Sequence, residues 1–377
     1  MKLFAFWFAL PLLAASPPRF EERTIATDLR GGYQVVAADL NRDGKPDLIA
    51  LASGMPELVW YENPGWQRHV IAGDLSRMIN CVYLDTDSGP VIVVAHAFEN
   101  QAKDSLGIVS VLRQNGDPRQ TWTVTEIDRI PTSHRLRAAR IDGGKPVVIN
   151  APLTGAKAGA PDYRDYTPLV YYRPGEWKRH MISNQLSGVV HGIWILDWDG
   201  DKRDDILTAS FTGIHLFQLG KTGMWTGIEL AKGDPAPWPK SGSSDVAVGK
   251  LGRERFLGAI EAWHGNQVVI YRPQGRGWNR QVIDDTLVDG HTIVTADLDG
   301  DGSDEVIAGY RGQGRSVYIY ASADRTGQKW TRQVLDDGGI AAAACAAADL
   351  DGDRRIDIAC IGSATANLKW YRNLGSR

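Results

Sequence analysis

One acidic pattern occurs four times along the 377-residue chain and constrains its fold more than any other feature. Each copy places acidic or amide side chains at positions 1, 3, 5 and 9 of a short loop, the arrangement in which oxygen atoms surround Ca²⁺. The loops span residues 39–47, 197–205, 297–305 and 349–357, with predicted ligands Asp39, Asn41, Asp43, Asp47, Asp197, Asp199, Asp201, Asp205, Asp297, Asp299, Asp301, Glu305, Asp349, Asp351, Asp353 and Asp357. Four copies in one context argue against a merely solvated turn. We therefore predict about four structural Ca²⁺ sites.

Apolar and β-branched residues flank these loops. Val35 and Val36 precede the first loop, and Leu48 and Ile49 follow it, so each loop is predicted to join two strands of a hairpin. An EF-hand is excluded because it needs Glu at position 12 and a helix on either side. Position 12 is here occupied by Ala50, Thr208, Ala308 and Cys360.

Three further segments keep the hairpin pattern but lose the acidic ligands. These degenerate loops lie near residues 83–91, 140–148 and 250–258. Arg140 and Lys250 place a cation where the first carboxylate would stand, so we predict no Ca²⁺ there. Together with the acidic loops they give seven units of about fifty residues.

A tryptophan-containing pattern recurs between the loops. Its first copy runs from Trp60 to Ile71 around an Asn-Pro-Gly turn, and similar copies surround Trp177 and Trp278. Each unit is therefore predicted to be a four-stranded antiparallel sheet, the size of a propeller blade. The last unit ends after its third strand, and residues 20–25 resemble the missing fourth. The predicted fold is all-β: a single seven-bladed β-propeller over residues 17–377, closed when the N-terminal strand joins the last blade.

The N-terminus and the net charge bound the location and the partners. Residues 1–16 are predicted to be a signal peptide, because Lys2 precedes an apolar run that is too short to span a bilayer. We expect a secreted or periplasmic protein without a membrane span. The formal net charge of -3 argues against nucleic acid as a partner.

The chain has three cysteines, and an odd number does not define a disulfide framework. Cys345 and Cys360 fall on the two arms of one predicted hairpin, so a disulfide between them is one alternative. Buried free thiols, also expected for Cys81, are the favoured interpretation.

Histidines gather at one position of the repeat. The first strand of each blade lines the channel of a propeller, and its start lies on the face opposite the acidic loops. Six residues before each loop stand Tyr33, Arg77, His134, His191, Ser244, His291 and Ala343. The second strand returns to this face and brings His96, His264 and Arg311 with it. The candidate catalytic residues at this channel mouth are therefore His134, His191, His291, His96, His264, Arg77, Arg311 and Tyr33.

These residue types suit proton transfer and metal binding. Histidine is a general acid or base near neutral pH, and neutral imidazole is a common Zn²⁺ ligand. An arginine stabilises a developing oxyanion, and Trp263 would stack on a sugar ring. A structural explanation stays open, in which a histidine merely caps each inner strand. The other units carry Tyr, Arg, Ser or Ala there, so the fold does not require histidine.

The acidic hairpins resemble the FG-GAP/VCBS repeats of bacterial secreted proteins and integrin α-subunit propellers. That resemblance implies structural Ca²⁺ on the four intact loops. The Trp60–Gly65 turn and the Trp66-x-Arg68-His69-x-Ile71 segment look more like the propeller domain of aldos-2-ulose dehydratase. This second resemblance implies elimination of water from keto-sugars and a divalent metal.

Two classes of function follow from these features. The first is a carbohydrate lyase or dehydratase that acts by proton abstraction and elimination, with Zn²⁺ or another divalent metal at the mouth. The alternative is a non-catalytic propeller that binds a glycan or a protein partner at the same mouth.

Overall fold

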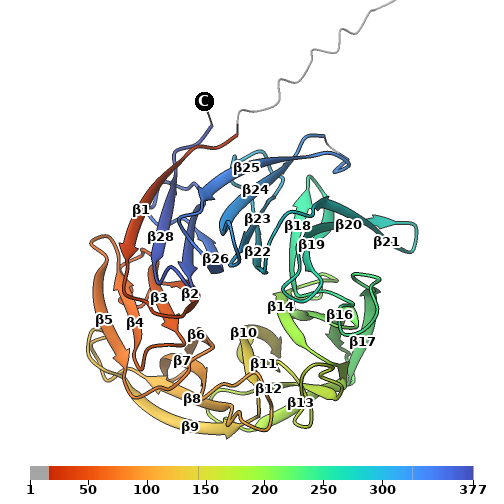
Figure 1. The fold of residues 1–377 in the computed structure, drawn as a ribbon. Helices are drawn as coiled ribbons and strands as arrows, with labels where there is room; N and C mark the ends of the chain where they lie inside the picture. Colours follow the sequence, from red (N-terminus) through yellow and green to blue (C-terminus); the bar gives the residue numbers. More distant parts are fainter. Residues whose placement is uncertain (1–16, 143, 325, 377) are drawn as a thin grey trace, which may run out of the picture.

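The chain forms a ring of seven antiparallel sheets (Figure 1). Residues of the innermost strand of every sheet line a central channel. The computed structural model describes residues 17–142, 144–324 and 326–376. The predicted all-β seven-bladed propeller is confirmed. The predicted signal peptide, residues 1–16, lies outside the described residues. No described segment forms a helix long and apolar enough to cross a membrane.

Each blade has four strands, counted outward from the channel. The inner strands are β2 (Gly32–Ala38), β6 (Asn80–Thr86), β10 (Ser133–Asp142), β14 (Val190–Leu196), β18 (Asp245–Leu251), β22 (Gly290–Ala296) and β26 (Ala342–Ala348). The second strands are β3 (Asp47–Ala52), β7 (Gly89–His96), β11 (Lys145–Pro152), β15 (Asp205–Ser210), β19 (Glu254–Glu261), β23 (Glu305–Tyr310) and β27 (Asp357–Gly362). The blades are numbered 1 to 7 in this order.

The two remaining positions of each blade lie farther from the channel. The third strands are β4 (Leu58–Glu62), β8 (Ile108–Arg113), β12 (Tyr166–Tyr172), β16 (Gly213–Leu219), β20 (Gln267–Gln274), β24 (Ser316–Ser322) and β28 (Leu368–Asn373). The outer strands are β5 (Gln67–Ala72), β9 (Thr123–Arg129), β13 (Arg179–Ser187), β17 (Trp225–Ala231), β21 (Gly277–Asp284), β25 (Trp330–Asp337) and, in blade 7, β1 (Phe20–Ala26).

The two ends of the chain share one blade. Strand β1 pairs antiparallel with β28, with Phe20 opposite Asn373 and Arg23 opposite Trp370. The N-terminal strand thus supplies the fourth strand of blade 7, as predicted. This pairing covers the outer edge of β28, which would otherwise be unpaired.

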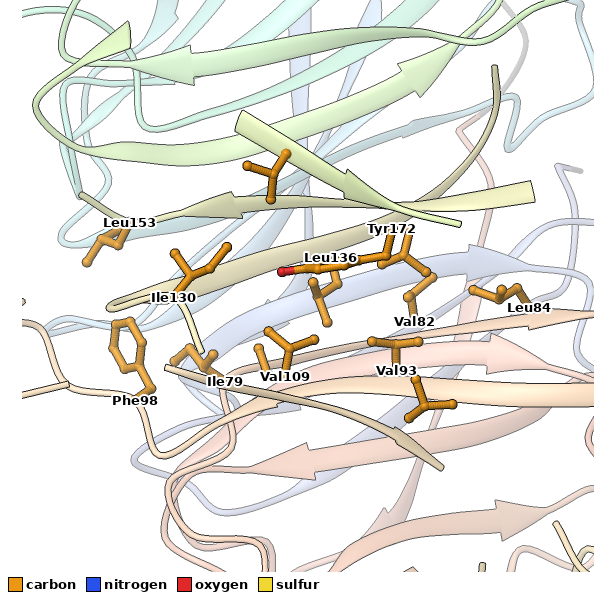
Figure 2. Close-up of a cluster of buried hydrophobic side chains, with 14 of the residues drawn as sticks. Ile79, Val82, Leu84, Val93, Phe98, Val109, Ile130, Leu136, Leu153 and Tyr172 are labelled. Atoms are coloured by element: carbon orange, nitrogen blue, oxygen red, sulfur yellow. The ribbon is translucent and has the colours of Figure 1, made fainter. Parts of the chain in front are cut away.

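The hydrophobic core is divided into clusters between neighbouring blades. The cluster in Figure 2 joins Val93 and Val109 of blade 2 to Leu136 and Tyr172 of blade 3. The second strands are buried on both faces, so β3 reads as an apolar run, whereas the outer β1 is mostly exposed. Burial of this apolar area, at roughly 25 cal/mol per Å², holds the blades together.

Polar side chains also connect consecutive blades near the start of the inner strands. The Gln34 amide bonds the backbone of Cys81 in both directions. The Asn80 oxygen accepts from the backbone N–H of Leu136 at 2.9 Å. The Thr292 hydroxyl accepts from the N–H of Cys345 at 3.1 Å. These buried hydrogen bonds fix the rotation of one blade against the next.

Cys345 and Cys360 form a disulfide, so the favoured expectation of free thiols is wrong for this pair. The two residues lie directly opposite each other on β26 and β27. Register therefore brings the two side chains to one face of the hairpin. Cys81 is free and buried, and burial raises the pKa of its thiol to about 12.

Candidate functional site

The candidate site begins with a bulge near the start of the inner strands. In five blades the pairing with the second strand skips one residue, which leaves that residue outside the regular ladder. A bulge re-aims the side chain that it carries. The skipped residues are Tyr33, His134, His191, His291 and Ala343. Four of them therefore converge at one end of the channel.

The bulged side chains form a contact ring. The Tyr33 hydroxyl lies 2.8 Å from Nε2 of His134. The His191 ring lies 5.0 Å from the rings of both His134 and His291, measured between centroids. Tyr33 closes the ring with an edge contact to His291 at 5.2 Å. We call these four residues together with His264 the histidine cluster.

His264 joins the cluster from the loop after β19. Its Nε2 lies 3.3 Å from Nε2 of His191. Its Nδ1 lies 3.2 Å from an Asp289 carboxylate oxygen and 3.3 Å from Nη2 of Arg311. Arg311 in turn donates two hydrogen bonds to Asp289. The Asp289–Arg311 pair thus fixes the orientation of the outermost imidazole.

Burial keeps the imidazoles neutral. His134, His191 and His291 are each 1% exposed. Burial, helped by nearby arginines, lowers the pKa of each of them well below the ordinary value of 6.5. Burial and Arg311 lower the pKa of His264 to about 4. All four rings are therefore uncharged at neutral pH and carry a lone pair on one nitrogen.

Three imidazoles lie close enough together that they could hold a metal ion. One ring nitrogen from each of His191, His264 and His291 lies within 4.8 Å of the other two. Nδ1 of His291 donates to the Ala343 carbonyl at 2.6 Å, and its buried Nε2 has no partner among the described residues. Nδ1 of His191 faces the Ser244 carbonyl at 3.2 Å. Such backbone bonds favour the tautomer with an unprotonated Nε2, which could act as a ligand. Nε2 of His191 also lies 3.5 Å from Nη2 of Arg135.

Two predicted residues lie apart from the histidine cluster. The His96 Nε2 bonds the Ser110 hydroxyl at 3.0 Å, within blade 2. Arg77 precedes β6, pairs with Glu99, and is 58% exposed. The backbone bond from Ile79 to Ala95 makes Ile79 the equivalent of the bulged position. The position predicted for this unit, Arg77, is therefore two residues too early in the sequence, because a tight hairpin replaces the acidic loop of this blade.

Arg135 is a site residue that the sequence argument missed. It follows the bulged His134, and its Nε donates to the His191 carbonyl at 2.8 Å. Its guanidinium also lies 5.5 Å from the centre of the Tyr33 ring. The signal was present, because Arg135 stands directly after a histidine of the repeat position.

The acidic loops lie at the opposite ends of the inner strands and share one hydrogen-bond pattern. In each, the position 1 carboxylate accepts backbone N–H groups from the following turn, as Asp349 does from Gly352 and Arg354. The position 9 carboxylate accepts from the N–H at position 2, as Asp357 does from Leu350. Equivalent bonds shape the other three loops. The backbone thus holds the carboxylates in a preformed cradle.

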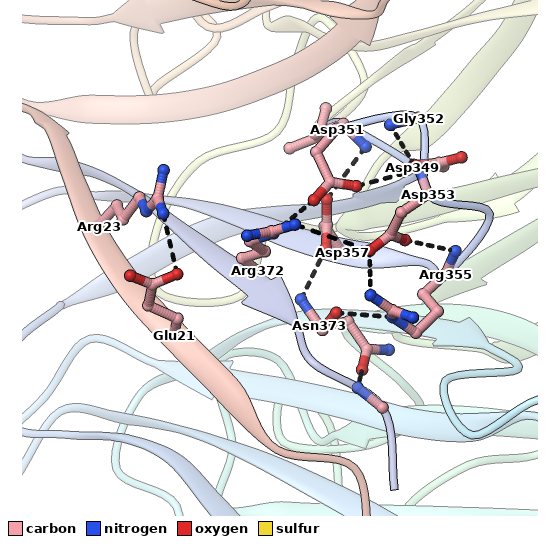
Figure 3. A network of polar contacts seen from close by, with 12 residues as sticks. Glu21, Arg23, Asp349, Asp351, Gly352, Asp353, Arg355, Asp357, Arg372 and Asn373 are labelled. Atoms are coloured by element: carbon pink, nitrogen blue, oxygen red, sulfur yellow. Dashed lines mark hydrogen bonds and ion pairs between the residues drawn. The ribbon is translucent and has the colours of Figure 1, made fainter.

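Carboxylate oxygens converge in three of these loops. The groups within 4.8 Å of one another are Asp197, Asp199 and Asp205, then Asp297, Asp299 and Glu305, then Asp349, Asp351 and Asp353. In the last loop Arg372 and Arg355 pair with the acids (Figure 3). The first loop is not among these three, and there the Asn41 amide donates hydrogen bonds to Asp43 and Glu62.

Burial raises the pKa of the position 9 carboxyl groups. The values are about 6 for Asp47, Asp205 and Asp357 and about 8 for Glu305. Buried carboxylates of this kind are stabilised by a nearby cation. The donor sets therefore fit a hard divalent ion such as Ca²⁺.

Comparison with known proteins agrees with the repeat and the fold. Residues 106–274 match the family described as aldos-2-ulose dehydratase, beta-propeller domain. Residues 297–360 match the FG-GAP-like repeat. The aldos-2-ulose dehydratase of Phanerodontia chrysosporium is 29% identical over 265 residues, which cover 60% of this chain and 29% of that protein. The chain resembles the propeller domain of an aldos-2-ulose dehydratase. The predicted resemblance is thereby confirmed, and the first matched segment contains His134, His191 and His264.

Solved structures share the propeller fold at low sequence identity. BBS1N from a complex with ARL6DN is 12% identical, with a TM-score of 0.59 and coverage of 95% of this chain and 97% of that one. A luciferin-regenerating enzyme is 9% identical, with a TM-score of 0.50 and coverage of 96% and 97%. At such identity the likeness concerns the fold alone.

Proposed function

We propose that the protein is a secreted, Ca²⁺-binding propeller whose histidine cluster acts on a carbohydrate as a lyase or dehydratase. The observation that carries this proposal is the convergence of the three buried, neutral imidazoles of His134, His191 and His291. Nε2 of His291 has no partner among the described residues. The likeness to the dehydratase propeller supports a keto-sugar or related carbohydrate as the substrate class. Only 29% of that relative is matched, so its activity serves only to choose the substrates that are tested.

The residues that would hold a divalent metal at the mouth are His191, His264 and His291. Their donor set fits Zn²⁺, for which three histidines with one open position are a common catalytic set. A bound metal would polarise a substrate carbonyl as a Lewis acid. Ser244, Ala343 and Asp289 act behind the ligands, because their oxygens orient the Nδ1 side of each ring.

Proton transfer is assigned to the Tyr33–His134 pair. The 2.8 Å hydrogen bond lets a proton pass between the phenol and the imidazole. Elimination breaks a C–H bond next to the carbonyl and the C–O bond of the departing hydroxyl. Neutral His134 takes the proton from carbon, and the hydroxyl leaves as water after it receives a proton from the pair.

The outer rim would bind the sugar. Arg311 is 19% exposed, and its charge favours an oxygen that becomes negative during proton abstraction. Trp263 lies against His264, with ring centres 4.9 Å apart, and offers an aromatic face to a sugar ring. His264 is the most exposed histidine of the cluster, with 29% of its side chain accessible, so a substrate would approach from its side.

The acidic loops are assigned a structural role. Loop carboxylates and backbone carbonyls would bind Ca²⁺ in the four intact loops. The loops join inner and second strands, so the ion stabilises each hairpin and does not touch the mouth. The Cys345–Cys360 disulfide supports a secreted or periplasmic location, because disulfides persist in oxidising compartments.

The test combines metal analysis with turnover. Purified protein and a His291→Ala variant are analysed for Ca, Zn, Mn and Fe and assayed with keto-sugars and uronates, following the ultraviolet absorbance of an unsaturated product. We expect about four Ca²⁺ in both proteins, with a transition metal and turnover in the parent only. Turnover that survives in the variant would contradict the role of the histidine cluster.

A non-catalytic glycan-binding or protein-binding propeller is the second candidate. A groove of about 390 Å³ runs beside Trp263 and is lined by Phe211, Pro161 and Pro239. The buried indole N–H of Trp263 has no acceptor among the described residues, so a ligand oxygen would satisfy it. Binding of a glycan that depends on Trp263, without turnover of any sugar, would favour this candidate.

A further inference from the structure

The central channel holds a cavity on the other side of the histidine cluster. Its volume is about 360 Å³, and all seven inner strands line it. Tyr33 and His291 form part of its wall, whereas His134, His191 and His264 do not. The lining continues to Ala38 and Ala347, next to the acidic loops. The cavity therefore extends toward the face opposite the candidate catalytic mouth.

One cation stands in an otherwise apolar ring of this channel. Arg137 lies two residues after Arg135 on β10 and so points to the same side of the strand. The residues at the same position in the other blades are Val36, Val82, Trp194, Ala247, Val294 and Ala346. The fold thus accepts apolar side chains at this position six times and has no structural need for an arginine.

Arg137 is only partly satisfied by the protein. Its Nη1 donates to the Asn80 side chain at 3.1 Å and to the Leu136 carbonyl at 2.8 Å. It forms no ion pair with any described residue, and its exposed part faces the cavity. Burial, together with Arg135, lowers the pKa of Arg137 to about 10. A desolvated cation of this kind destabilises the fold unless something compensates it.

The charges along the cavity do not balance. Its charged lining residues are Arg135, Arg137 and Asp245. Arg135 is already used in the contact between blades, through its bond to the His191 carbonyl. Even with Asp245 ionised, one positive charge remains inside the channel. The surplus matches a ligand with a single negative charge.

We propose that this cavity binds a small organic monocarboxylate, with the carboxylate on the guanidinium of Arg137. A planar guanidinium presents paired N–H donors that match the two carboxylate oxygens. The Asn80 amide nitrogen, for which the described residues supply no acceptor, stands beside it as a further donor. The apolar part of the ligand would be surrounded by Val36, Val82, Val294, Ala346 and Trp194. A cavity of this size and mixed lining is typical of small-molecule sites. The inference does not depend on the proposed carbohydrate activity.

Benzoate and benzamide are the probes, because they have the same shape and differ in charge. Calorimetric titration at constant ionic strength compares the parent with Arg137→Gln and Arg140→Gln. Arg140 is an exposed arginine on the same strand and serves as the matched control. We expect benzoate to bind the parent and the control alike, and at least about tenfold more weakly to Arg137→Gln, the loss typical of a charged hydrogen bond. Benzamide should bind the parent at least about tenfold more weakly than benzoate for the same reason.

Four results would overturn the proposal. Three of them are no benzoate binding to the parent, equal binding of benzoate and benzamide, and equal weakening in Arg137→Gln and Arg140→Gln. The fourth is binding of sulfate as tight as that of benzoate, which would contradict an organic ligand. The parent comparison of the two probes needs no variant, so a misfolded Arg137→Gln leaves the proposal open to refutation. Metal content and sugar turnover are measured separately, so failure here is distinguishable from failure of the proposed function.

Discussion

The two faces of the propeller use the same repeat in opposite ways. On the acidic-loop face, four blades repeat nearly the same set of oxygen-bearing side chains and one hydrogen-bond pattern. At the mouth, the equivalent position carries histidine in three blades and Tyr, Ile, Ser or Ala in the other four, and from this set only Tyr33, His134, His191 and His291 belong to the histidine cluster. Repetition identifies what each blade needs for itself. Variation at an equivalent position identifies residues that the single blade does not require.

Adding one metal at a time to the metal-free protein should distinguish the roles of the two faces most clearly. Chelation followed by dialysis is expected to lower the melting temperature strongly, because each ion at a hundred times its Kd stabilises by about 2.7 kcal/mol. Added Ca²⁺ should restore the melt without turnover, and Zn²⁺ or a related metal should restore turnover. Asp299→Asn should lose part of the Ca²⁺ effect, while Asp85→Asn in a degenerate loop should not. If Ca²⁺ alone restored both the melting temperature and turnover, the proposed difference between the two faces would be contradicted.

A fall in pH should destabilise the folded protein through the histidine cluster when the acidic loops are saturated with Ca²⁺. The folded pKa of each cluster histidine is lowered below the unfolded value near 6.5, so the unfolded chain binds more protons below that pH. The free energy of unfolding should therefore fall as pH decreases from about 6.5 toward 4, by up to about 1.4 kcal/mol per pH unit for each histidine. Denaturant titrations of the Ca²⁺-loaded, Zn²⁺-free protein measure this slope, which His291→Gln should reduce. Without Ca²⁺ the raised loop carboxyls would add a slope of opposite sign.

Removal of one mouth ligand should affect chemistry without weakening the loops. His291→Ala is expected to lower kcat/KM by at least about 100-fold, because loss of a residue that only orients a metal ligand already costs about 10- to 100-fold. His180→Ala, on the outer strand β13, is the matched control and should retain full activity. Metal analysis should show unchanged Ca²⁺ in both variants. A large loss of Ca²⁺ in His291→Ala would show that the two faces are coupled.

Tyr33→Phe should give the smallest effect. The change removes the hydroxyl that bonds His134 and leaves the aromatic contact with His291. We expect a loss of about 100-fold in kcat with metal retained, which is the lower end of the range for one proton-transfer group. A changed pH profile distinguishes this role from simple packing. An unaltered kcat would remove the Tyr33–His134 pair from the proposed chemistry.

The fold was predictable because its determinants are local and repeated. The acidic hairpins, the tryptophan turns and the split last unit each point to the same ring, and β1 closes it on β28. Alignment failed only in blade 2, where a tight hairpin replaces the acidic loop and moves the bulged position from Arg77 to Ile79. The disulfide was one of two alternatives, because a hairpin pattern does not tell which residues lie opposite.

The sequence by itself determined the blade, its count and the histidines of the repeat position, since these depend on short-range patterns that recur. Only the tertiary structure decided which side chains meet. It set His96 apart, brought Asp289 and Arg311 against His264, and enclosed Arg137 in an apolar ring. Contacts between blades depend on the rotation of one sheet against the next, which no single repeat specifies. Burial in the closed ring then lowers the pKa of the histidines and keeps them neutral.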